Sequence, residues 1–525
     1  MKTSSDSTNN TTKSERNGLV GAWYLGNHLS RPGGSNLLTS LDINFDMYTG
    51  YGSDWSAQWE GYLMAPVDGE VILYGETNRE MILTFEGDEL LHLGEGNEKT
   101  EAKINVKKGE KYPVLLTYLQ KVGGPTYLKL SWSWGNREKH AIPLESVSFT
   151  DEQASYWNYI ERPKPEDFDF SQLNNIPVEN YIAYYDSVRY AGWAANNGIW
   201  KWGNEILVGF SLGYYNPIPT GAHAFLNEKP FVTALVRSLD GGKSWKLEIP
   251  EGLNNSQFKE TPAIDFSNPD VILKFEGRKY YVSQDRSKNW DSPFKVNLVA
   301  ENISVDDLTS RTDYIVLGPK ECLVFMSAKN EEAQSYFQDR SFCTLTTDGG
   351  KTFQFLGWIT HNNEIRSVMS SSVQIEKDHL VSVVRRRYDQ RNDGDRVPRT
   401  QNYIEAAESK DNGKTWANLG KVAETDLGER NGNPPSMVKL PDGRLCVAYG
   451  YRDFPYGIRM KVSNDNGHTW GKEYAVRTDG TNWDLGYTRM TVNAEGKIVV
   501  LYYISTKERK AQHLGVSIVD PSDLI

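Results

Sequence analysis

The stretch SLDGGKSW, from Ser238 to Trp245, is the first of a series of related turns that decide the fold of most of the chain. Its pattern, Ser/Thr-x-Asp-x-Gly-x-Ser/Thr-aromatic, returns in SQDRSKNW (283–290, a degenerate copy), TTDGGKTF (346–353), SKDNGKTW (409–416) and SNDNGHTW (463–470). Successive central aspartates are 45, 63, 63 and 54 residues apart. An interval of this size accommodates one four-stranded antiparallel sheet, so the repeat predicts a β-propeller.

The central aspartate of each turn has a local structural task. A carboxylate such as that of Asp240 accepts hydrogen bonds from the backbone N–H groups of its own loop. The glycine allows a positive φ, and the aromatic side chain closes the edge of the sheet. We therefore interpret these carboxylates as fold elements and not as catalytic groups.

The five turns resemble the Asp-boxes, or BNR repeats, of the sialidase superfamily. A strand, a tight turn and a second apolar strand precede them, as in NPPSMVKLPDGRLCVAYGYR (433–452). We count six such units, of which the last, from about 482 to 525, has no boxed turn and is expected to pair with a strand near 181–188. The resemblance implies an all-β domain over 181–525, a six-bladed propeller, with seven blades left open.

Residues 18–150 form a separate unit of short strand-like runs and turns, which predicts an antiparallel β-sandwich. Its segments GLVGAWY (18–24), WEGYLMAPVDGEVILYGET (59–77) and KKGEKYPVLLTYLQKVGGPTYLKLSWSW (107–134) resemble the protective-antigen-type glycan-binding domain. Members that bind sugar through calcium carry paired aspartates where this chain has Glu76-Thr77-Asn78-Arg79-Glu80. Calcium is therefore not indicated, no other cofactor is implied, and the domain serves either to bind a glycan or as a spacer.

Two polar segments flank this unit. Residues 1–17 are rich in Ser, Thr and Asn and lack the apolar region of a signal peptide, so we read them as a flexible leader. Such a leader often remains after an export signal has been removed, which predicts a periplasmic, cell-surface or extracellular protein. Residues 151–180 contain Arg162-Pro163-Lys164-Pro165, and proline at this density predicts an extended linker.

Composition excludes several classes of partner. The formal net charge is −11 and no long basic run occurs, which argues against nucleic acid and anionic membrane surfaces. No apolar run approaches the roughly 18 residues of a membrane-spanning helix. The three cysteines Cys322, Cys343 and Cys446 are too few and too scattered for a disulfide framework or a zinc site. The 12% aromatic content suits stacking on sugar rings.

Propeller sites form on the loops that lead into the first strand of each blade, around the central channel. The candidates on these loops are Arg189, Asn196, Asn197, Asp270, Arg311, Asp313, Arg366, Glu429, Arg430, Asn433, Asp484, Tyr487 and Arg489. Clustered arginines suit a substrate carboxylate, because a guanidinium group pairs with it through two hydrogen bonds. Salt bridges between blades are the alternative for each residue. We predict substrate binding by Arg189, Asn197, Arg311, Arg366, Arg430 and Arg489.

Two further basic segments border this set. Arg385-Arg386-Arg387 alternates across a strand, so at most one face of the run points to the channel. Arg396 and Arg399 lie in a polar insertion, residues 390–401, that we expect to overhang the site.

The sialidase resemblance implies a tyrosine nucleophile, activated by a glutamate, beside three arginines that hold the carboxylate of sialic acid. Tyr487 lies where the family has its tyrosine, and Glu429 is the candidate activator. However, the family signature Arg-Ile-Pro is replaced by Arg189-Tyr190-Ala191. This departure argues against sialic acid itself as the substrate.

A second resemblance is closer. The segments ANNGIWKWGNEILVGF (195–210) and WDLGYTRMTV (483–492) are similar to a branch of sialidase-like bacterial propellers that includes rhamnosidases and ulvan-lyase-like enzymes. These act on rhamnose linked to glucuronic acid and depend on histidines of the first blade. Here His223 is the one histidine of that blade, and Asn197 stands where we expect another. Asparagine cannot take a proton at neutral pH, so His223 acts with a tyrosine or this activity is lost.

These observations predict an enzyme that cleaves a terminal sugar from a glycan containing sialic or uronic acid, as a sialidase-like glycoside hydrolase with His223, Tyr487 and Glu429 as catalytic residues. A polysaccharide lyase or rhamnosidase on rhamnose–glucuronate linkages is the first alternative. A non-catalytic glycan-binding protein is the second. No histidine pair has metal-binding spacing, so no metal site is expected.

Overall fold

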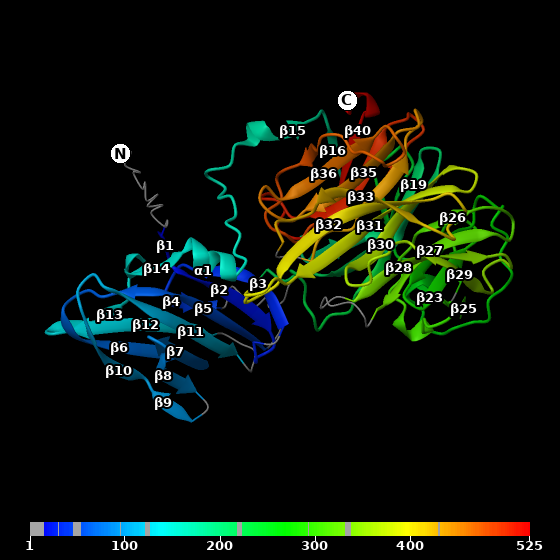
Figure 1. The fold of residues 1–525 in the computed structure, drawn as a ribbon. Helices are drawn as coiled ribbons and strands as arrows, with labels where there is room; N and C mark the ends of the chain where they lie inside the picture. The colour runs from blue at the N-terminus through cyan, green and yellow to red at the C-terminus, as the bar shows by residue number, and fades with distance from the viewer. Residues whose placement is uncertain are drawn as a thin grey trace, which may run out of the picture. The chain divides into compact units, whose positions relative to one another are not determined.

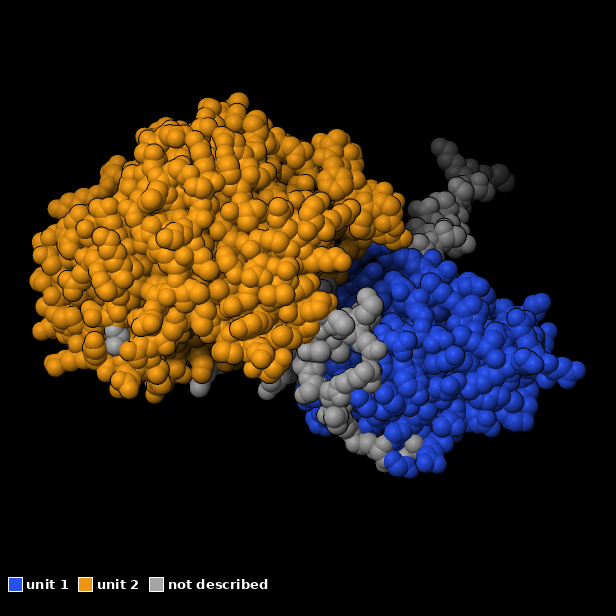
Figure 2. Space-filling view, turned by 180° about the vertical axis from the view of Figure 1, so that it is seen from behind, with its two compact units in different colours: residues 1–161, 220–222, 391–399 blue, residues 162–219, 223–390, 400–525 orange. Residues whose placement is uncertain are grey.

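The computed structural model describes residues 15–29, 31–45, 54–94, 96–120, 126–217, 223–291, 293–330, 338–428 and 431–525. Its secondary structure is almost entirely β-strand, which confirms the all-β prediction (Figure 1). The chain divides into two compact units, coloured separately in Figure 2. Unit 1 comprises residues 1–161, 220–222 and 391–399, and unit 2 comprises residues 162–219, 223–390 and 400–525.

Unit 1 contains two sheets among its described residues. In the larger sheet the strands follow the order β1-β14-β5-β11-β7-β8-β9; β2 also pairs with β5, and β3 pairs with β2. In the smaller sheet the order is β10-β6-β12-β13, and β4 also pairs with β12. The larger sheet consists of β1 (Glu15–Asn17), β2 (Leu19–Leu25), β3 (Arg31–Leu38), β5 (Trp55–Met64), β7 (Glu80–Phe85), β8 (Asp88–Gly94), β9 (Asn97–Lys99), β11 (Lys111–Gln120) and β14 (Val147–Thr150). The smaller consists of β4 (Asp42–Asn44), β6 (Gly69–Thr77), β10 (Glu101–Val106), β12 (Tyr127–Trp134) and β13 (Arg137–Ala141).

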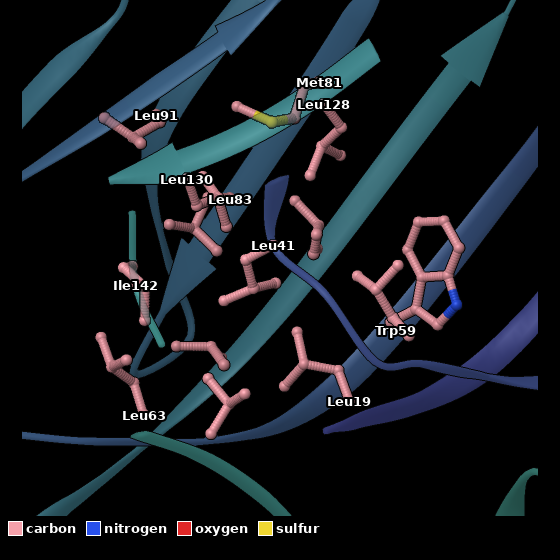
Figure 3. Close-up of a cluster of buried hydrophobic side chains, with 14 of the residues drawn as sticks. Leu19, Leu41, Trp59, Leu63, Met81, Leu83, Leu91, Leu128, Leu130 and Ile142 are labelled. Atoms are coloured by element: carbon pink, nitrogen blue, oxygen red, sulfur yellow. The ribbon is translucent and has the colours of Figure 1, made fainter. Parts of the chain in front are cut away.

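The core of unit 1 is apolar and follows the period of two expected for strands with one buried face. Burial alternates residue by residue along β7 and along most of β11. Leu116 from the larger sheet and Leu130 from the smaller are both buried in one cluster, part of which Figure 3 shows with Leu130 and Trp59 among its labelled residues. Burying a leucine of this kind stabilises the fold by roughly 1.5–3 kcal/mol.

Unit 1 extends past the boundary at residue 150 that we expected. The helix α1 (Asp151–Tyr156) begins at Thr150, whose hydroxyl accepts a hydrogen bond from the backbone of Gln153 while the Gln153 side chain returns one to Thr150. Residues 391–399 also belong to this unit, and Val397 is buried in a cluster with Val20 and Trp157. This insertion is therefore part of the apolar packing of unit 1.

Unit 2 contains six separate sheets among its described residues. Sheet 1 holds β17 (Arg189–Gly192), β18 (Gly198–Trp202), β19 (Glu205–Tyr214), β20 (Val232–Ser238) and β21 (Lys246–Glu248). Sheet 2 holds β22 (Ile272–Glu276), β23 (Lys279–Ser283) and β24 (Phe294–Lys295), and sheet 3 holds β25 (Leu298–Val299), β26 (Tyr314–Val316), β27 (Cys322–Lys329), β28 (Asp339–Thr346) and β29 (Phe353–Trp358).

The remaining sheets continue the series in chain order. Sheet 4 holds β30 (Arg366–Glu376), β31 (His379–Gln390), β32 (Arg399–Ser409) and β33 (Ala417–Glu424), and sheet 5 holds β34 (Ser436–Lys439), β35 (Leu445–Tyr451), β36 (Gly457–Ser463) and β37 (Tyr474–Arg477), with β15 (Asn174–Asn175) at its edge. Sheet 6 holds β38 (Gly486–Val492), β39 (Ile498–Ile504), β40 (His513–Val519) and β16 (Glu179–Tyr184). Since β16 pairs with β40, the strand predicted near 181–188 joins the last sheet as expected.

The boxed turns have the local hydrogen bonds that the sequence predicts. In the first of them, Asp240 accepts from the backbone N–H of Ser244 at 2.9 Å and from its hydroxyl at 2.6 Å. Trp245 closes the turn by donating its ring N–H to the carbonyl oxygen of Gly242 at 2.8 Å. Burial would raise the pKa of Asp240, but these hydrogen bonds outweigh it and lower the pKa to about 2.

Two smaller predictions are also tested. Cys322 and Cys343 lie on the adjacent strands β27 and β28, and both are buried free thiols. Over the residues that the structure describes, no helix has the length and apolar character needed to cross a membrane.

Candidate functional site

Tyr487 stands at the start of β38 on a constrained backbone. Gly486 has a φ of 96° and Tyr487 a φ of 47°, both in the left-handed region. Asn433 holds this turn, since its Oδ1 accepts from the Tyr487 backbone N–H at 2.9 Å and its Nδ2 donates to the Leu485 carbonyl oxygen at 2.8 Å. A Cβ at position 486 would lie 2.3 Å from Asn433 Nδ2, so only glycine fits there. The turn therefore fixes the direction of the tyrosine side chain.

Two guanidinium groups flank the phenol of Tyr487. Arg385 donates to its hydroxyl oxygen at 3.2 Å, and the Arg452 guanidinium carbon lies 5.4 Å from the ring centroid. Burial would raise the pKa of this hydroxyl, but the charges of Arg385, Arg452 and then His223 outweigh it and lower the pKa to about 7. These charges shift the Tyr487 hydroxyl toward the phenolate, whereas an unperturbed tyrosine ionises near pH 10.

A third arginine joins this pair through Asn431. The Asn431 side-chain oxygen accepts from Arg366 at 2.9 Å, and its backbone carbonyl oxygen accepts from Arg385. Arg366 is also paired with Asp339 at 2.6 Å. Burial lowers the pKa of Arg385 to about 10, with repulsion from Arg366 and Arg452 acting in the same direction against the attraction of Tyr487. The arrangement concentrates positive charge beside Tyr487.

His223 is held by a buried carboxylate. Its Nδ1 lies 2.6 Å from Asp484 Oδ1, and Asp484 also accepts from the hydroxyl of Tyr503 at 2.7 Å and from that of Tyr190 at 3.1 Å. Burial would raise the pKa of Asp484, but the interaction with His223 and these hydrogen bonds lower it. Because a carboxylate only accepts, His223 donates from Nδ1, and its Nε2 accepts a hydrogen bond when the ring is neutral and donates one when the ring is protonated.

The imidazole of His223 is 26% exposed and contacts two indoles. Its ring centroid is 5.3 Å from that of Trp193 and 5.2 Å from that of Trp483. An aromatic wall of this kind beside an accessible nitrogen is suited to a sugar ring and its hydroxyl groups.

Asp313 is a second group whose ionisation falls near neutrality. It accepts hydrogen bonds from the hydroxyls of Ser370 at 2.8 Å and Ser372 at 2.9 Å. Burial nevertheless raises the pKa of Asp313 to about 6, against the attraction of Arg489. The residue as a whole is half-buried, and its carboxyl oxygens are held by the hydroxyls of Ser370 and Ser372 and by the Ser372 backbone N–H.

Backbone strain marks the same region. Trp193, Met369 and Tyr487 all have positive φ although none is glycine. Met369 contacts Arg385 through its sulfur at 3.8 Å, and Trp193 and Tyr487 pack against one cluster. Such conformations cost on the order of 1–3 kcal/mol each and persist where the surroundings fix them, commonly at functional sites.

The predicted residues separate into groups. His223, Tyr487 and Arg366 come together in the cluster just described, whereas Arg189 donates to the Gly213 carbonyl oxygen at 2.7 Å and packs on Tyr214. Arg489 is buried and donates to the carbonyl oxygens of Ala195 and Thr312. Glu429 and Arg430 lie outside the described residues.

Two predicted residues lie beside the first sheet. Asn197 is 3% exposed and donates to the Trp193 carbonyl oxygen at 3.3 Å, so it supports the turn that carries this indole. Arg311 donates to Asn196 Oδ1 at 3.0 Å and lines a separate groove.

Sequence reasoning missed Arg385, Arg452, Trp193, Trp483 and Tyr503. For Arg385 a signal existed, because the alternation of Arg385-Arg386-Arg387 allows one face to point to the channel, and Arg385 is the residue that reaches Tyr487. Arg452 is the last residue of the segment 433–452, and nothing in the sequence pattern indicated that it would lie beside Tyr487. Among the described residues there is no group of three or more histidine, cysteine or acidic side chains arranged to hold a metal ion.

Comparison with known families agrees with the resemblance to BNR repeats and with the resemblance to the protective-antigen-type domain. Residues 274–500 match the BNR repeat-like domain and residues 42–146 match the PA14 domain. The chain therefore carries a PA14 domain, which is a glycan-binding domain, followed by a sialidase-like BNR domain. No curated protein matches the chain.

Solved structures give weaker likenesses. A protein of unknown function from Dyadobacter fermentans has 20% identity and a TM-score of 0.48, over 65% of this chain and 99% of its own. The Trypanosoma rangeli sialidase bound to the inhibitor DANA has 13% identity and a TM-score of 0.40, over 65% of this chain and 60% of its own. The α-L-arabinofuranosidase Arb93A from Fusarium graminearum has 14% identity and a TM-score of 0.39, over 67% and 98%. Likenesses of this size do not establish a shared activity.

Proposed function

We propose that this protein is a glycan-cleaving enzyme of the sialidase-like glycosidase type, with Tyr487 as the reacting group. The observation that carries the proposal is the Tyr487 hydroxyl, whose pKa falls to about 7 beside Arg385 and Arg452. A phenolate attacks an anomeric carbon or removes a proton, whereas a neutral phenol does neither efficiently.

The charge around Tyr487 favours an acidic sugar. Arg385 and Arg452 place two positive charges beside Tyr487, and Arg366, which is paired with Asp339, lies next to Arg385 through Asn431. A substrate carboxylate would offset the repulsion that Arg385 experiences from its neighbours. We place the carboxylate of a sialic or uronic acid on this arginine side of Tyr487.

The proposed hydrolysis proceeds in two steps. The Tyr487 phenolate bonds to the anomeric carbon while the glycosidic oxygen leaves with a proton from the carboxyl group of Asp313, whose pKa of about 6 allows it to be protonated in the same pH range. Asp313, now ionised, then takes a proton from a water molecule that attacks the anomeric carbon and releases Tyr487. His223, fixed through Asp484, binds a hydroxyl group of the sugar through Nε2.

A lyase is the second candidate, because the site also offers an accessible imidazole. In that reaction the phenolate removes the C5 proton of a uronate, the C4–O bond breaks, and His223 in its protonated form supplies a proton to the departing oxygen. The Asp484 carboxylate, 2.6 Å from His223, stabilises the protonated imidazole.

The arrangement of the sheets belongs to the same proposal. We infer that the six sheets of unit 2 are the blades of a six-bladed propeller and that the two sheets of unit 1 form a sandwich. In this reading the PA14 domain holds the glycan while the BNR domain cleaves it. Export from the cytoplasm fits both roles and remains a prediction.

One experiment separates the candidates. The full chain is incubated with sialyl oligosaccharides and with rhamnosyl-glucuronate oligosaccharides, and the products are followed by mass spectrometry and ultraviolet absorbance. A saturated free sugar is the expected result, while an unsaturated, ultraviolet-absorbing product would identify a lyase. Binding without any cleavage on both panels would contradict the enzyme and favour a glycan-binding protein.

A further inference from the structure

A groove separate from the Tyr487 cluster runs along sheets 1 and 2 of unit 2. Its volume is about 870 Å³, within the usual range for small-ligand sites. Trp193, Phe258 and Tyr281 contribute aromatic surface, and Phe258 is 40% exposed. Trp193 also contacts His223, so one side chain borders both the groove and the site of the proposed reaction.

The side chains that line the groove carry a net positive charge, whereas the whole protein carries a net negative charge. Its lining holds four basic side chains, Lys274, Arg278, Lys279 and Arg311, against two acidic ones, Glu276 and Asp306. The whole chain has a net charge of −11. A local excess of positive charge therefore attracts an anionic ligand to this groove from solution.

Most of these charges neutralise one another. Glu276 lies 2.7 Å from the ammonium group of Lys274 and 3.1 Å from that of Lys279. Arg278 is paired with Asp306. These contacts leave Arg311 as the guanidinium group that no carboxylate neutralises within the described lining.

Arg311 is held rigidly by neutral acceptors. Its Nε donates to Asn196 Oδ1 at 3.0 Å, and its Nη1 donates to the carbonyl oxygens of Thr309 at 3.1 Å and Ser310 at 2.9 Å. Nη2 makes no hydrogen bond to the described residues, and the side chain is partly exposed. A preorganised cation with a free donor binds a carboxylate at little entropic cost.

We propose that this groove is a subsite for the continuation of a uronic-acid glycan, whose carboxylate is bound by Arg311 while aromatic side chains stack on its rings. The inference rests on the proposed function for the identity of the ligand as a glycan. It extends that function, because it assigns chain-length and charge preference to residues that do not touch the cleaved bond.

The test measures binding by isothermal titration calorimetry, with the full chain carrying Tyr487→Phe so that nothing is cleaved. The probes are a β-1,4-linked glucuronic acid hexasaccharide and cellohexaose, which differ in their carboxylates. We expect the acidic probe to bind roughly ten-fold more tightly, and we expect Arg311→Met to remove most of that difference.

Arg286→Met is the matched control, since it removes one guanidinium from another loop of unit 2 outside the groove lining. It should retain the preference for the acidic probe. Equal binding of the two probes, or equal losses in the Arg311 and Arg286 variants, would overturn the subsite. Arg311→Lys serves if the methionine variant does not fold, and it should weaken the preference only partly.

The two proposals fail separately. Binding that depends on Arg311 in a protein whose wild-type form cleaves no substrate would refute the enzyme and keep the subsite. Cleavage that is independent of Arg311, on short and long acidic substrates alike, would refute the subsite and keep the enzyme.

Discussion

Tyr118 in unit 1 and Tyr487 in unit 2 are both largely removed from water, yet the pKa values of their hydroxyl groups move in opposite directions. Burial raises the pKa of Tyr118 to about 12, and its hydroxyl hydrogen-bonds the neutral Thr126. Tyr487 also loses water, but Arg385 and Arg452 stabilise its anion, and its pKa falls to about 7. At Tyr118 burial outweighs the charge of Arg79, whereas at Tyr487 the two guanidinium groups outweigh burial.

The interiors of the two units also differ in the charge of the side chains that they bury. The cluster around Trp59 in unit 1 consists of apolar and aromatic residues. In unit 2, the largest fully buried side chains include Arg385, Arg386, Arg452 and Arg459. Burying a guanidinium group costs several kcal/mol unless it is hydrogen-bonded, so unit 2 gives up stability to hold positive charge in place.

The largest expected effect separates the two tyrosines. Tyr487→Phe should lower kcat/KM on an acidic glycan by roughly a thousand-fold, because the reacting oxygen is lost, with little change in Tm. Tyr118→Phe should instead leave kcat/KM unchanged and cost about 1 kcal/mol of stability, through its hydrogen bond to Thr126. Steady-state kinetics and thermal unfolding of both variants check the pair. Similar kcat/KM values for the two variants would contradict the predicted difference between Tyr487 and Tyr118.

The second effect concerns the origin of the lowered pKa. Arg385→Met should move the midpoint of Tyr487 ionisation upward from about 7 toward the ordinary value of about 10. Ultraviolet absorption of the phenolate, titrated against pH with Tyr487→Phe as the reference, measures this midpoint. Arg189→Met is the control, since Arg189 packs on Tyr214. An unchanged midpoint in the Arg385 variant would show that its charge is not the cause.

The smallest effect concerns a carboxylate whose role is purely structural. Asp240→Ala should cost about 1–2 kcal/mol of unfolding free energy, through the lost hydrogen bonds of its turn, and leave kcat/KM unchanged. The pKa of folded Asp240 is lowered to about 2, so the stabilisation is present above about pH 4 and lost as pH falls toward 2. Urea unfolding at neutral and acidic pH, with the exposed Asp167→Ala as the control, tests both statements. A loss of activity without a loss of stability would assign Asp240 a different role.

The sequence predicted some residues of the candidate site and missed others, and the difference depends on how far apart in the chain the contacting residues lie. Tyr487 was predicted from its position just before the first strand of the last repeat, where the sialidase family has its tyrosine. Arg385 lies 102 residues away from it and within a strand, where an arginine more often faces solvent or a neighbouring charge. Arg311 was predicted to bind substrate, but its place in a groove apart from Tyr487 depends on Asn196, 115 residues earlier in the chain.

The sequence by itself determined the repeated turns. Among the described residues, the Asp240 carboxylate accepts hydrogen bonds only from residues within four positions along the chain, so the octapeptide itself contains all of these donors. Only the tertiary structure decided the chemistry of Tyr487 and His223. His223 meets Asp484 across 261 residues, and no local pattern encodes a partner at that distance. Short-range hydrogen bonds need a motif alone, whereas a shifted pKa needs charges that the packing of separate sheets brings together.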